Sequence, residues 1–233
     1  MATNDFTPSA GRRGFIGSLA AGAATLGIAG LATPLKSFAE KANLNAPVGD
    51  PDTWFNTVKG KHKIVYDSPH PNGPFPFAWS RVFLLTNTAT GTPEKECSVV
   101  VVLRHDSIPF AFEDRLWEKY KFGETFKITD AATGKPSIRN PFWKPAPGTF
   151  NIPGFGVLEL GINELQASGV MFCVCEAAIT VNSAVMAQGM KKDAAEVRKD
   201  WMTGILPGIQ PVPSGVWALG RAQEKGCAYV FAG

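Results

Sequence analysis

Cys97-Ser98-Val99-Val100-Val101-Val102-Leu103 is an unbroken run of apolar and β-branched side chains. A strand with one face in water alternates apolar and polar residues, whereas a strand covered on both faces does not. Residues 170–175, VMFCVC, show the same pattern later in the chain. Strands covered on both faces are typical of parallel sheets. The two runs therefore predict an α/β protein with a mostly parallel sheet.

Strand and helix patterns alternate on both sides of these runs. Further strands are expected over 62–67, 208–213 and 227–231, and Pro211 in the second of them indicates a sheet edge or the end of a strand. Helices are expected over 75–88, 108–120, 157–167, 177–188, 193–206 and 216–225. Repeated β–α order predicts helices on both faces of the sheet, in a three-layer α/β/α sandwich. Residues 62–233 are expected to form one domain without an internal repeat.

The composition fits one globular core. The chain has 233 residues, of which 45% are apolar and 18% are charged, and it contains 16 Phe and 6 Trp. This excludes an intrinsically disordered chain. The formal net charge of +3 falls to +1 when the first 39 residues are left out. Such a small charge gives no reason to expect a nucleic-acid partner.

Residues 1–39 carry an export pattern. Residues 12–16, RRGFI, precede a weakly apolar Ala/Gly/Leu run from Ser18 to about Ala32. This resembles a twin-arginine translocation signal. The small residues of 37–39 predict cleavage before Glu40. A transmembrane anchor is the alternative, but the run is shorter than the ~20 residues that a spanning helix needs. We therefore expect the twin-arginine export machinery as a partner and a soluble protein in the periplasm.

Two segments differ from the strand–helix pattern. Residues 40–61 are polar and contain prolines, which predicts an arm or linker. Residues 121–153 are rich in Gly, Pro and aromatic side chains and are too long for a simple connection, which predicts an insertion. Its aromatic side chains need cover from their own domain or from a neighbouring subunit. We expect a homo-oligomer in which Phe142 and Trp143 contact another chain.

Ligands of open α/β sheets bind at the carboxyl ends of the strands. His105 follows the strand 97–103, while Cys175 and Glu176 close the strand 170–175. Ser214 and Gly215 join another strand to the helix that follows it. We expect these residues to share one sheet edge. Cys97 and Cys227 begin their strands, so they are expected at the opposite edge as small buried side chains.

Cys175 is the main candidate for chemistry. A thiol at the start of a helix experiences the positive end of the helix dipole, which favours the nucleophilic thiolate. Cys173 projects to the same sheet face and is expected to pack beneath a helix. The four cysteines allow three complete disulfide pairings, and the sequence does not choose among them.

His105 is a candidate proton donor, thiolate partner or metal ligand, with a structural, hydrogen-bonded histidine as the alternative. His62 and His70 are expected to be solvated loop residues. One histidine with one or two cysteines falls short of a metal-ligand set, so no metal is expected. The Gly-rich dinucleotide and phosphate motifs and the Gly-x-Ser-x-Gly elbow are missing from the sequence, and no cofactor is expected.

Four segments carry a family resemblance: 99–105, 165–175, 212–216 and 223–230. They resemble the DsrE/DsrF-like family from about His62 to the end, with 121–153 as an addition. The resemblance implies a flavodoxin-like α/β/α sandwich, homo-oligomers such as trimers or hexamers, and a cysteine that carries sulfur as a persulfide. Cys175 matches the family cysteine after the third strand.

Together these features predict an exported sulfur carrier or thiol-handling protein. Cys175 and His105 are its expected catalytic residues, and the expected ligand-binding residues are Ser214, Gly215, Glu176 and Cys173. The sequence names neither the sulfur donor nor the acceptor. Two alternatives stay open. One is a non-catalytic oligomeric binding module that uses residues 140–145, and the other is a metal or small-ligand binder through His105 and Cys175.

Overall fold

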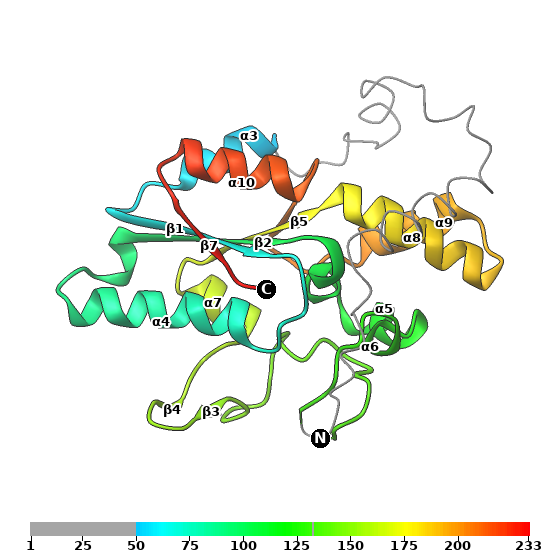
Figure 1. Ribbon diagram of the computed structural model, residues 1–233, viewed down its shortest axis with the longest axis horizontal. Helices are drawn as coiled ribbons and strands as arrows, with labels where there is room; N and C mark the ends of the chain where they lie inside the picture. The colour runs from blue at the N-terminus through cyan, green and yellow to red at the C-terminus, as the bar shows by residue number, and fades with distance from the viewer. Residues whose placement is uncertain (1–49, 132) are drawn as a thin grey trace, which may run out of the picture. The chain divides into compact units, whose positions relative to one another are not determined.

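The computed structural model describes residues 50–131 and 133–233. The expected export signal over 1–39 and the first part of the segment 40–61 lie outside the described residues. The main sheet has five parallel strands in the order β6-β5-β2-β1-β7 (Figure 1). The strands are β1 (His62–Ser68), β2 (Cys97–Leu103), β5 (Met171–Cys175), β6 (Ile209–Val212) and β7 (Ala228–Phe231). The predicted parallel sheet is confirmed, and β6, which contains Pro211, lies at an edge.

Helices cover both faces of this sheet. The longer ones are α4 (Phe75–Ala89), α8 (Glu176–Met190), α9 (Ala194–Thr203) and α10 (Gly215–Glu224). Short helices are α3 (Pro51–Trp54), α5 (Asp114–Lys119), α6 (Phe122–Thr125), α7 (Ile162–Ala167) and the 3-10 turns η2 (Phe55–Thr57), η3 (Glu94–Glu96) and η4 (His105–Ala111). A separate antiparallel pair joins β3 (Asn151–Ile152) and β4 (Gly156–Val157).

The strand order explains which helix covers which face. From β1 through β2 and β5 to β6 the chain moves in one direction across the sheet, and it then returns past β1 to add β7. Crossovers between parallel strands are right-handed, so a reversal of direction puts the last helix on the other face. Accordingly α4 and α7 lie on one side of the sheet in Figure 1, and α10 lies with α3 on the other. This confirms the three-layer α/β/α sandwich with flavodoxin-like layering.

Side chains that alternate along the strands form two separate cores. Val99, Val101 and Leu103 of β2 face the larger core on the α4 side. Val100 and Val102 face the smaller core beneath α10. Burial on both faces is why the strand 97–103 lacks polar alternation, as the sequence predicts.

The segment 40–61 is not an arm throughout. Within its described part, Phe55 is fully buried and Val58 is 5% exposed, and both belong to the core beneath α10. The ring of Phe55 meets that of Trp217 on α10 edge to face, with centroids 5.8 Å apart. Apolar contact with α10 outweighs the polar composition of the segment, and residues from Pro51 onward pack on the domain.

Residues 121–153 fold back onto their own domain. Phe142 is only 5% exposed and stacks on Phe77 of α4 with ring centroids 4.1 Å apart. Phe142 also meets Phe110 edge to face at 5.2 Å and stacks on Phe150 at 5.3 Å. The core of its own domain therefore covers Phe142, and the homo-oligomer in which Phe142 and Trp143 contact another chain stays a prediction. Trp143 is partly buried against the same core.

Two expected helices are shorter than predicted. The segment 108–120 divides into η4 and α5, with Pro109 inside the 3-10 turn and Phe112 bridged to Ile205 between them. Proline lacks the amide hydrogen that a continuous helix needs. The segment 157–167 is helical only from Ile162, since the Glu164 carboxylate accepts the Gly161 amide hydrogen at 2.8 Å and fixes the helix start there.

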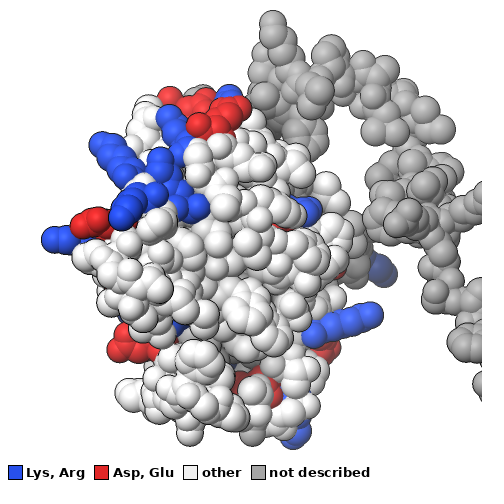
Figure 2. Space-filling view, turned by 60° about the vertical axis from the view of Figure 1, so that its left-hand side comes forward, with Lys and Arg blue, Asp and Glu red and all other residues white. Residues whose placement is uncertain are grey.

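Over the described residues, no helix combines the length and apolar character that crossing a membrane requires. On the face shown in Figure 2, charged side chains gather at the margins, with the main blue group at the upper left. A broad area between these groups carries neither basic nor acidic side chains.

An ion-pair network fastens α9 to α5. The Asp200 carboxylate accepts hydrogen bonds from Arg115 at 2.5 Å and from Lys119 and Tyr120 at 2.6 Å each. Partial burial alone would raise the pKa of Asp200, but these three donors outweigh it and lower the pKa to about 2. The carboxylate therefore stabilises the fold above its ordinary pKa of about 4, and this contribution disappears as the pH falls toward 2.

We expect Asp200→Asn to lower the free energy of unfolding at pH 7 by roughly 1–2 kcal/mol, after allowance for solvent screening. Urea denaturation of both proteins at several pH values measures the difference, which should shrink between about pH 4 and pH 2. Glu118→Gln, at an exposed position of α5, is the control and should change stability by less than about 0.5 kcal/mol. Equal stability of the Asp200 variant and the parent at pH 7 would contradict the network.

Candidate functional site

Three neighbouring strands bring the predicted residues to one edge of the sheet. Ser68 at the end of β1 pairs with Leu103 at the end of β2, which pairs with Val174 of β5. Cys175 at the end of β5 pairs with Val212 of β6. The segments that contain His105, Cys175 and Ser214 therefore leave the sheet at the same edge, where ligands of this fold class bind.

A buried ion pair that sequence analysis missed lies at this edge. Asp67, which is 2% exposed, accepts two hydrogen bonds from Arg104, from Nε at 2.6 Å and from Nη2 at 2.9 Å. The hydroxyl of Tyr229 on β7 donates to the same carboxylate at 2.8 Å. The only signal in the sequence is an acidic residue directly after the apolar run 64–66. Its partners depend on strand register, which periodicity does not reveal.

Asp67 dominates the electrostatic surroundings of Arg104. The hydrogen bond to Asp67 is the main reason that the pKa of Arg104 is raised, against the opposing effect of partial burial. The negative charges that Asp67, Tyr229 and Cys175 carry when ionised raise it further. Arg104 is therefore held chiefly by the buried carboxylate, and the charge of an ionised Cys175 is the smallest of the effects on its pKa.

Cys175 caps the helix α8, which starts at this edge. Its Sγ accepts the amide hydrogen of Ala178 at 3.3 Å, in the first turn of the 15-residue α8. This geometry directs the positive end of the helix dipole at the sulfur. Cys175 is 6% exposed, so only a small reagent can approach its sulfur while the edge stays closed.

The other three thiols have surroundings that oppose ionisation. Cys173 is fully buried beneath α10, and burial raises its pKa strongly. At the opposite end of the strands, burial raises the pKa of Cys97, with the charges of Glu94 and Glu96 adding to the effect. Burial also raises the pKa of Cys227. All four cysteines are free thiols in the structure.

Glu176 serves helix packing. Glu176 is 6% exposed, and its carboxylate accepts a hydrogen bond from Arg198 of α9 at 2.9 Å. Arg198 also donates to the Thr180 hydroxyl of α8 at 3.0 Å. Burial raises the pKa of Glu176, and Arg198 partly offsets this rise. The residue follows Cys175 as the sequence predicts, but its contacts join α8 to α9.

Ser214 and Gly215 position their neighbours. The Ser214 hydroxyl accepts the amide hydrogen of Trp217 at 3.2 Å and so caps α10. A Cβ atom on Gly215 would lie 2.6 Å from the Cβ of Arg104 and 2.7 Å from its Cδ. Gly215 therefore leaves room for Arg104, and its place in the site is indirect.

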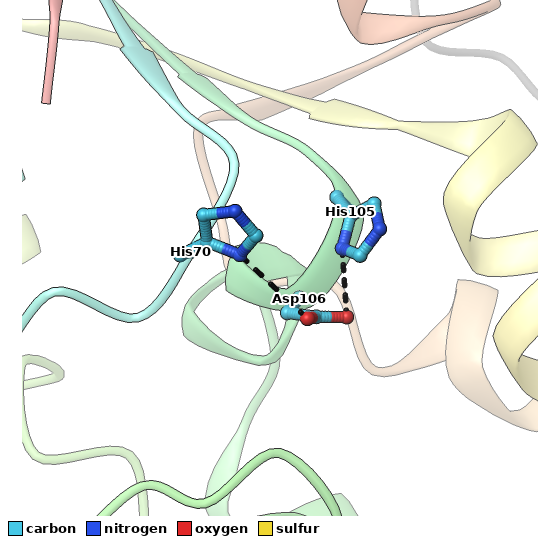
Figure 3. A group of neighbouring side chains, drawn as sticks. All are labelled: His70, His105 and Asp106. Carbon is cyan, nitrogen blue, oxygen red and sulfur yellow. Dashed lines mark ion pairs between the residues drawn. The ribbon is translucent and has the colours of Figure 1, made fainter. Parts of the chain in front are cut away.

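His105 belongs to a second group of side chains (Figure 3). Its Nδ1 lies 2.8 Å from Oδ1 of Asp106, and Nδ1 of His70 lies 3.7 Å from Oδ2 of the same carboxylate. The two imidazole rings meet edge to face with centroids 5.4 Å apart. Among the described residues, these are the side chains that the structure places against His105, and a pairing with Cys175 stays a prediction.

A cavity of about 360 Å³ lies between the segment after β1 and residues 127–150. Pro71, Phe110 and Phe142 form part of its wall, together with Lys127 and Arg139. Its lining contains none of the residues predicted for the site, so the chemistry-bearing side chains lie outside it.

Comparisons with known proteins add little to this geometry. No family model matches the sequence, and no curated protein matches it. A solved structure titled as a protein of unknown function, MTH1491 from Methanobacterium thermoautotrophicum, aligns with 16% sequence identity and a TM-score of 0.33. The alignment covers 73% of this chain and 98% of that one.

Proposed function

We propose that this chain is an exported sulfur-carrying protein that holds a sulfane sulfur on Cys175. The observation that carries the proposal is the position of the Cys175 sulfur at the start of α8, where it accepts the Ala178 amide hydrogen at 3.3 Å. The resemblance to the DsrE/DsrF-like family supports a persulfide at this position. The resemblance of residues 1–39 to a twin-arginine signal supports export.

The transfer needs no external oxidant or reductant. With thiosulfate as donor, the Cys175 thiolate attacks the outer sulfur, the sulfur–sulfur bond of the donor breaks, and sulfite leaves with the bonding electron pair. A persulfide anion remains on Cys175. An acceptor thiolate then attacks the outer sulfur of the persulfide, and Cys175 leaves as a thiolate. One sulfur atom has moved from donor to acceptor.

Two features of the edge suit an anionic sulfur. The first turn of α8 directs the Ala178 amide hydrogen toward it, and the guanidinium of Arg104, held by two hydrogen bonds to the Asp67 carboxylate, follows β2 at the same edge. The 6% exposure of Cys175 protects a persulfide from bulk solvent and restricts donors to small molecules. In this proposal Arg104 is the anion partner of the sulfur.

Mass spectrometry of the purified protein after incubation with thiosulfate or polysulfide tests the proposal. We expect a gain of ~32 Da, the mass of one sulfur atom, located on the peptide that contains Cys175. Cys175→Ser should abolish the gain. Cys97→Ser is the matched control, because Cys97 is a partly exposed thiol at the opposite edge, and it should keep the gain. A parent protein that gains no mass, or a Cys175 variant that still gains it, would refute sulfur carriage here.

A further inference from the structure

We propose that His70, His105 and Asp106 form a binding site for a divalent transition-metal ion of the zinc type. One nitrogen from each imidazole and one carboxylate oxygen all lie within 4.8 Å of one another. The three side chains project toward a common point at the carboxyl edge of the sheet (Figure 3). This site is separate from Cys175, and it does not depend on the sulfur-carrying function.

The sheet brings the three ligands together from two loops. His70 follows β1, and His105 with Asp106 follows β2, which is the parallel neighbour of β1. The backbone of the two loops is hydrogen bonded at this point. The Arg104 amide donates to the Ser68 carbonyl at 3.1 Å, and the Asp106 amide donates to the Pro69 carbonyl at 2.9 Å. These bonds fix the separation of the two loops before any ion binds.

The backbone of His105 is held in an uncommon conformation. Its φ of +52° is in the left-handed region, which is unfavourable for a residue other than glycine. The structure tolerates this cost, and the imidazole lies against Asp106 and near His70 (Figure 3). The strained conformation of His105 thus places its imidazole beside the other two metal-ligating side chains.

The distances leave only a small adjustment to be made. Ligand atoms about 2.0–2.2 Å from a tetrahedral zinc ion are about 3.4 Å apart. His105 Nδ1 lies 2.8 Å from Oδ1 of Asp106, and His70 Nδ1 lies 3.7 Å from Oδ2 of the same carboxylate, so the side chains must turn to offer one ion three ligand atoms. The side chains of His70 and His105 are 56% and 48% exposed, so both can rotate to complete the site.

The ligand types define the ion and its coordination. Two imidazole nitrogens and one carboxylate oxygen suit zinc and related first-row ions, whereas magnesium and calcium prefer all-oxygen sites. Three protein ligands leave a fourth position for water, as in catalytic rather than structural zinc sites. The exposure of the cluster lets water or a small anion reach that position. Sequence analysis placed His70 among solvated loop residues, because it gave no way to see that the loops after β1 and β2 are joined.

Zinc titration by isothermal calorimetry of the full chain, made without a polyhistidine tag and stripped with a chelator, tests the site. We expect one zinc ion per chain. His70→Ala, His105→Asn and Asp106→Asn should each weaken binding about tenfold or more, since even the loss of a group that merely orients a ligand costs this much. Asparagine at position 105 tolerates the left-handed conformation, so this variant removes the imidazole with little strain.

Two controls separate this site from other zinc ligands. The chain has three histidines, and the third, His62, is exposed at the start of β1, so His62→Ala should leave the affinity unchanged. Cys175→Ser should also bind zinc normally. Circular dichroism confirms that each variant is folded, and cobalt substitution gives an absorption band that His70→Ala should alter. A parent chain that binds no zinc overturns the proposal, as does equal loss in the His62 variant or loss in the Cys175 variant.

Discussion

Phe77→Ala is expected to lower the free energy of unfolding by about 3–5 kcal/mol, the usual cost of removing a fully buried phenylalanine ring. Phe77 projects from α4 into the larger core, where its ring stacks on Phe142 at 4.1 Å and meets Phe110 edge to face at 5.4 Å. Domains of this size are stable by about 5–15 kcal/mol, so the variant should lose a large share of its stability. Urea denaturation followed by circular dichroism measures the loss.

Phe75→Ala is the matched control, because Phe75 lies two residues earlier on α4 and is 42% exposed. It should cost less than about 1 kcal/mol. If Phe77→Ala gives insoluble protein, Phe77→Leu keeps much of the volume and should cost about 1–2 kcal/mol. Similar losses for Phe75→Ala and Phe77→Ala would show that the aromatic core is placed wrongly.

A double-mutant cycle between Phe77 and Phe142 extends this test to the segment 121–153. Stacked aromatic pairs contribute about 0.5–1.5 kcal/mol beyond their buried area. We therefore expect a coupling energy of this size, because the rings are in direct contact within one chain. A coupling energy near zero would mean that Phe77 and Phe142 are not in contact within one chain. It would favour the alternative in which Phe142 contacts another subunit.

The strands of the main sheet could be predicted because their burial leaves a direct mark on the sequence. Residues 97–103 are apolar on both faces, and the structure places them in a central strand between two cores. Tertiary contacts decide the features of the fold that local sequence patterns did not predict. The expected helix 108–120 is broken where Phe112 bridges to Ile205, and the expected arm is packed where Phe55 meets α10. Neither contact is visible in local periodicity.

The candidate site, like the fold, could be predicted only in part. Cys175, His105 and Ser214 could be placed at one edge because each follows a predicted strand, and parallel strands end together. Their partners could not be predicted. The pairing of Asp67 with Arg104 depends on strand register, and the approach of His70 to His105 depends on the hydrogen bonds between two loops. These contacts join residues 35 or more positions apart, beyond the reach of a pattern within one element.

Gly215→Ala is expected to lower the free energy of unfolding by about 2–3 kcal/mol, within the usual cost of overpacking a closed site. Gly215 is buried at the first position of α10, where a new Cβ would lie 2.6 Å from the Cβ of Arg104. An atom so near the backbone cannot swing aside as the end of a long side chain can. Arg104 must shift, and its two hydrogen bonds to the buried Asp67 carboxylate must lengthen or break.

Gly220→Ala, on the same helix, is the matched control. Gly220 is exposed, and a Cβ there would meet no atom within 4 Å, so alanine should stabilise the protein by about 0.5–1 kcal/mol through its higher helix propensity. The two substitutions add the same methyl group, and their opposite effects would come only from what each methyl meets. Urea denaturation gives both values.

Because Arg104 is also the proposed anion partner of Cys175, Gly215→Ala should slow the gain of sulfur from thiosulfate while Gly220→Ala leaves its rate unchanged. If Gly215→Ala destabilises the protein but gains sulfur at the parent rate, Arg104 has a structural role and takes no part in the sulfur chemistry.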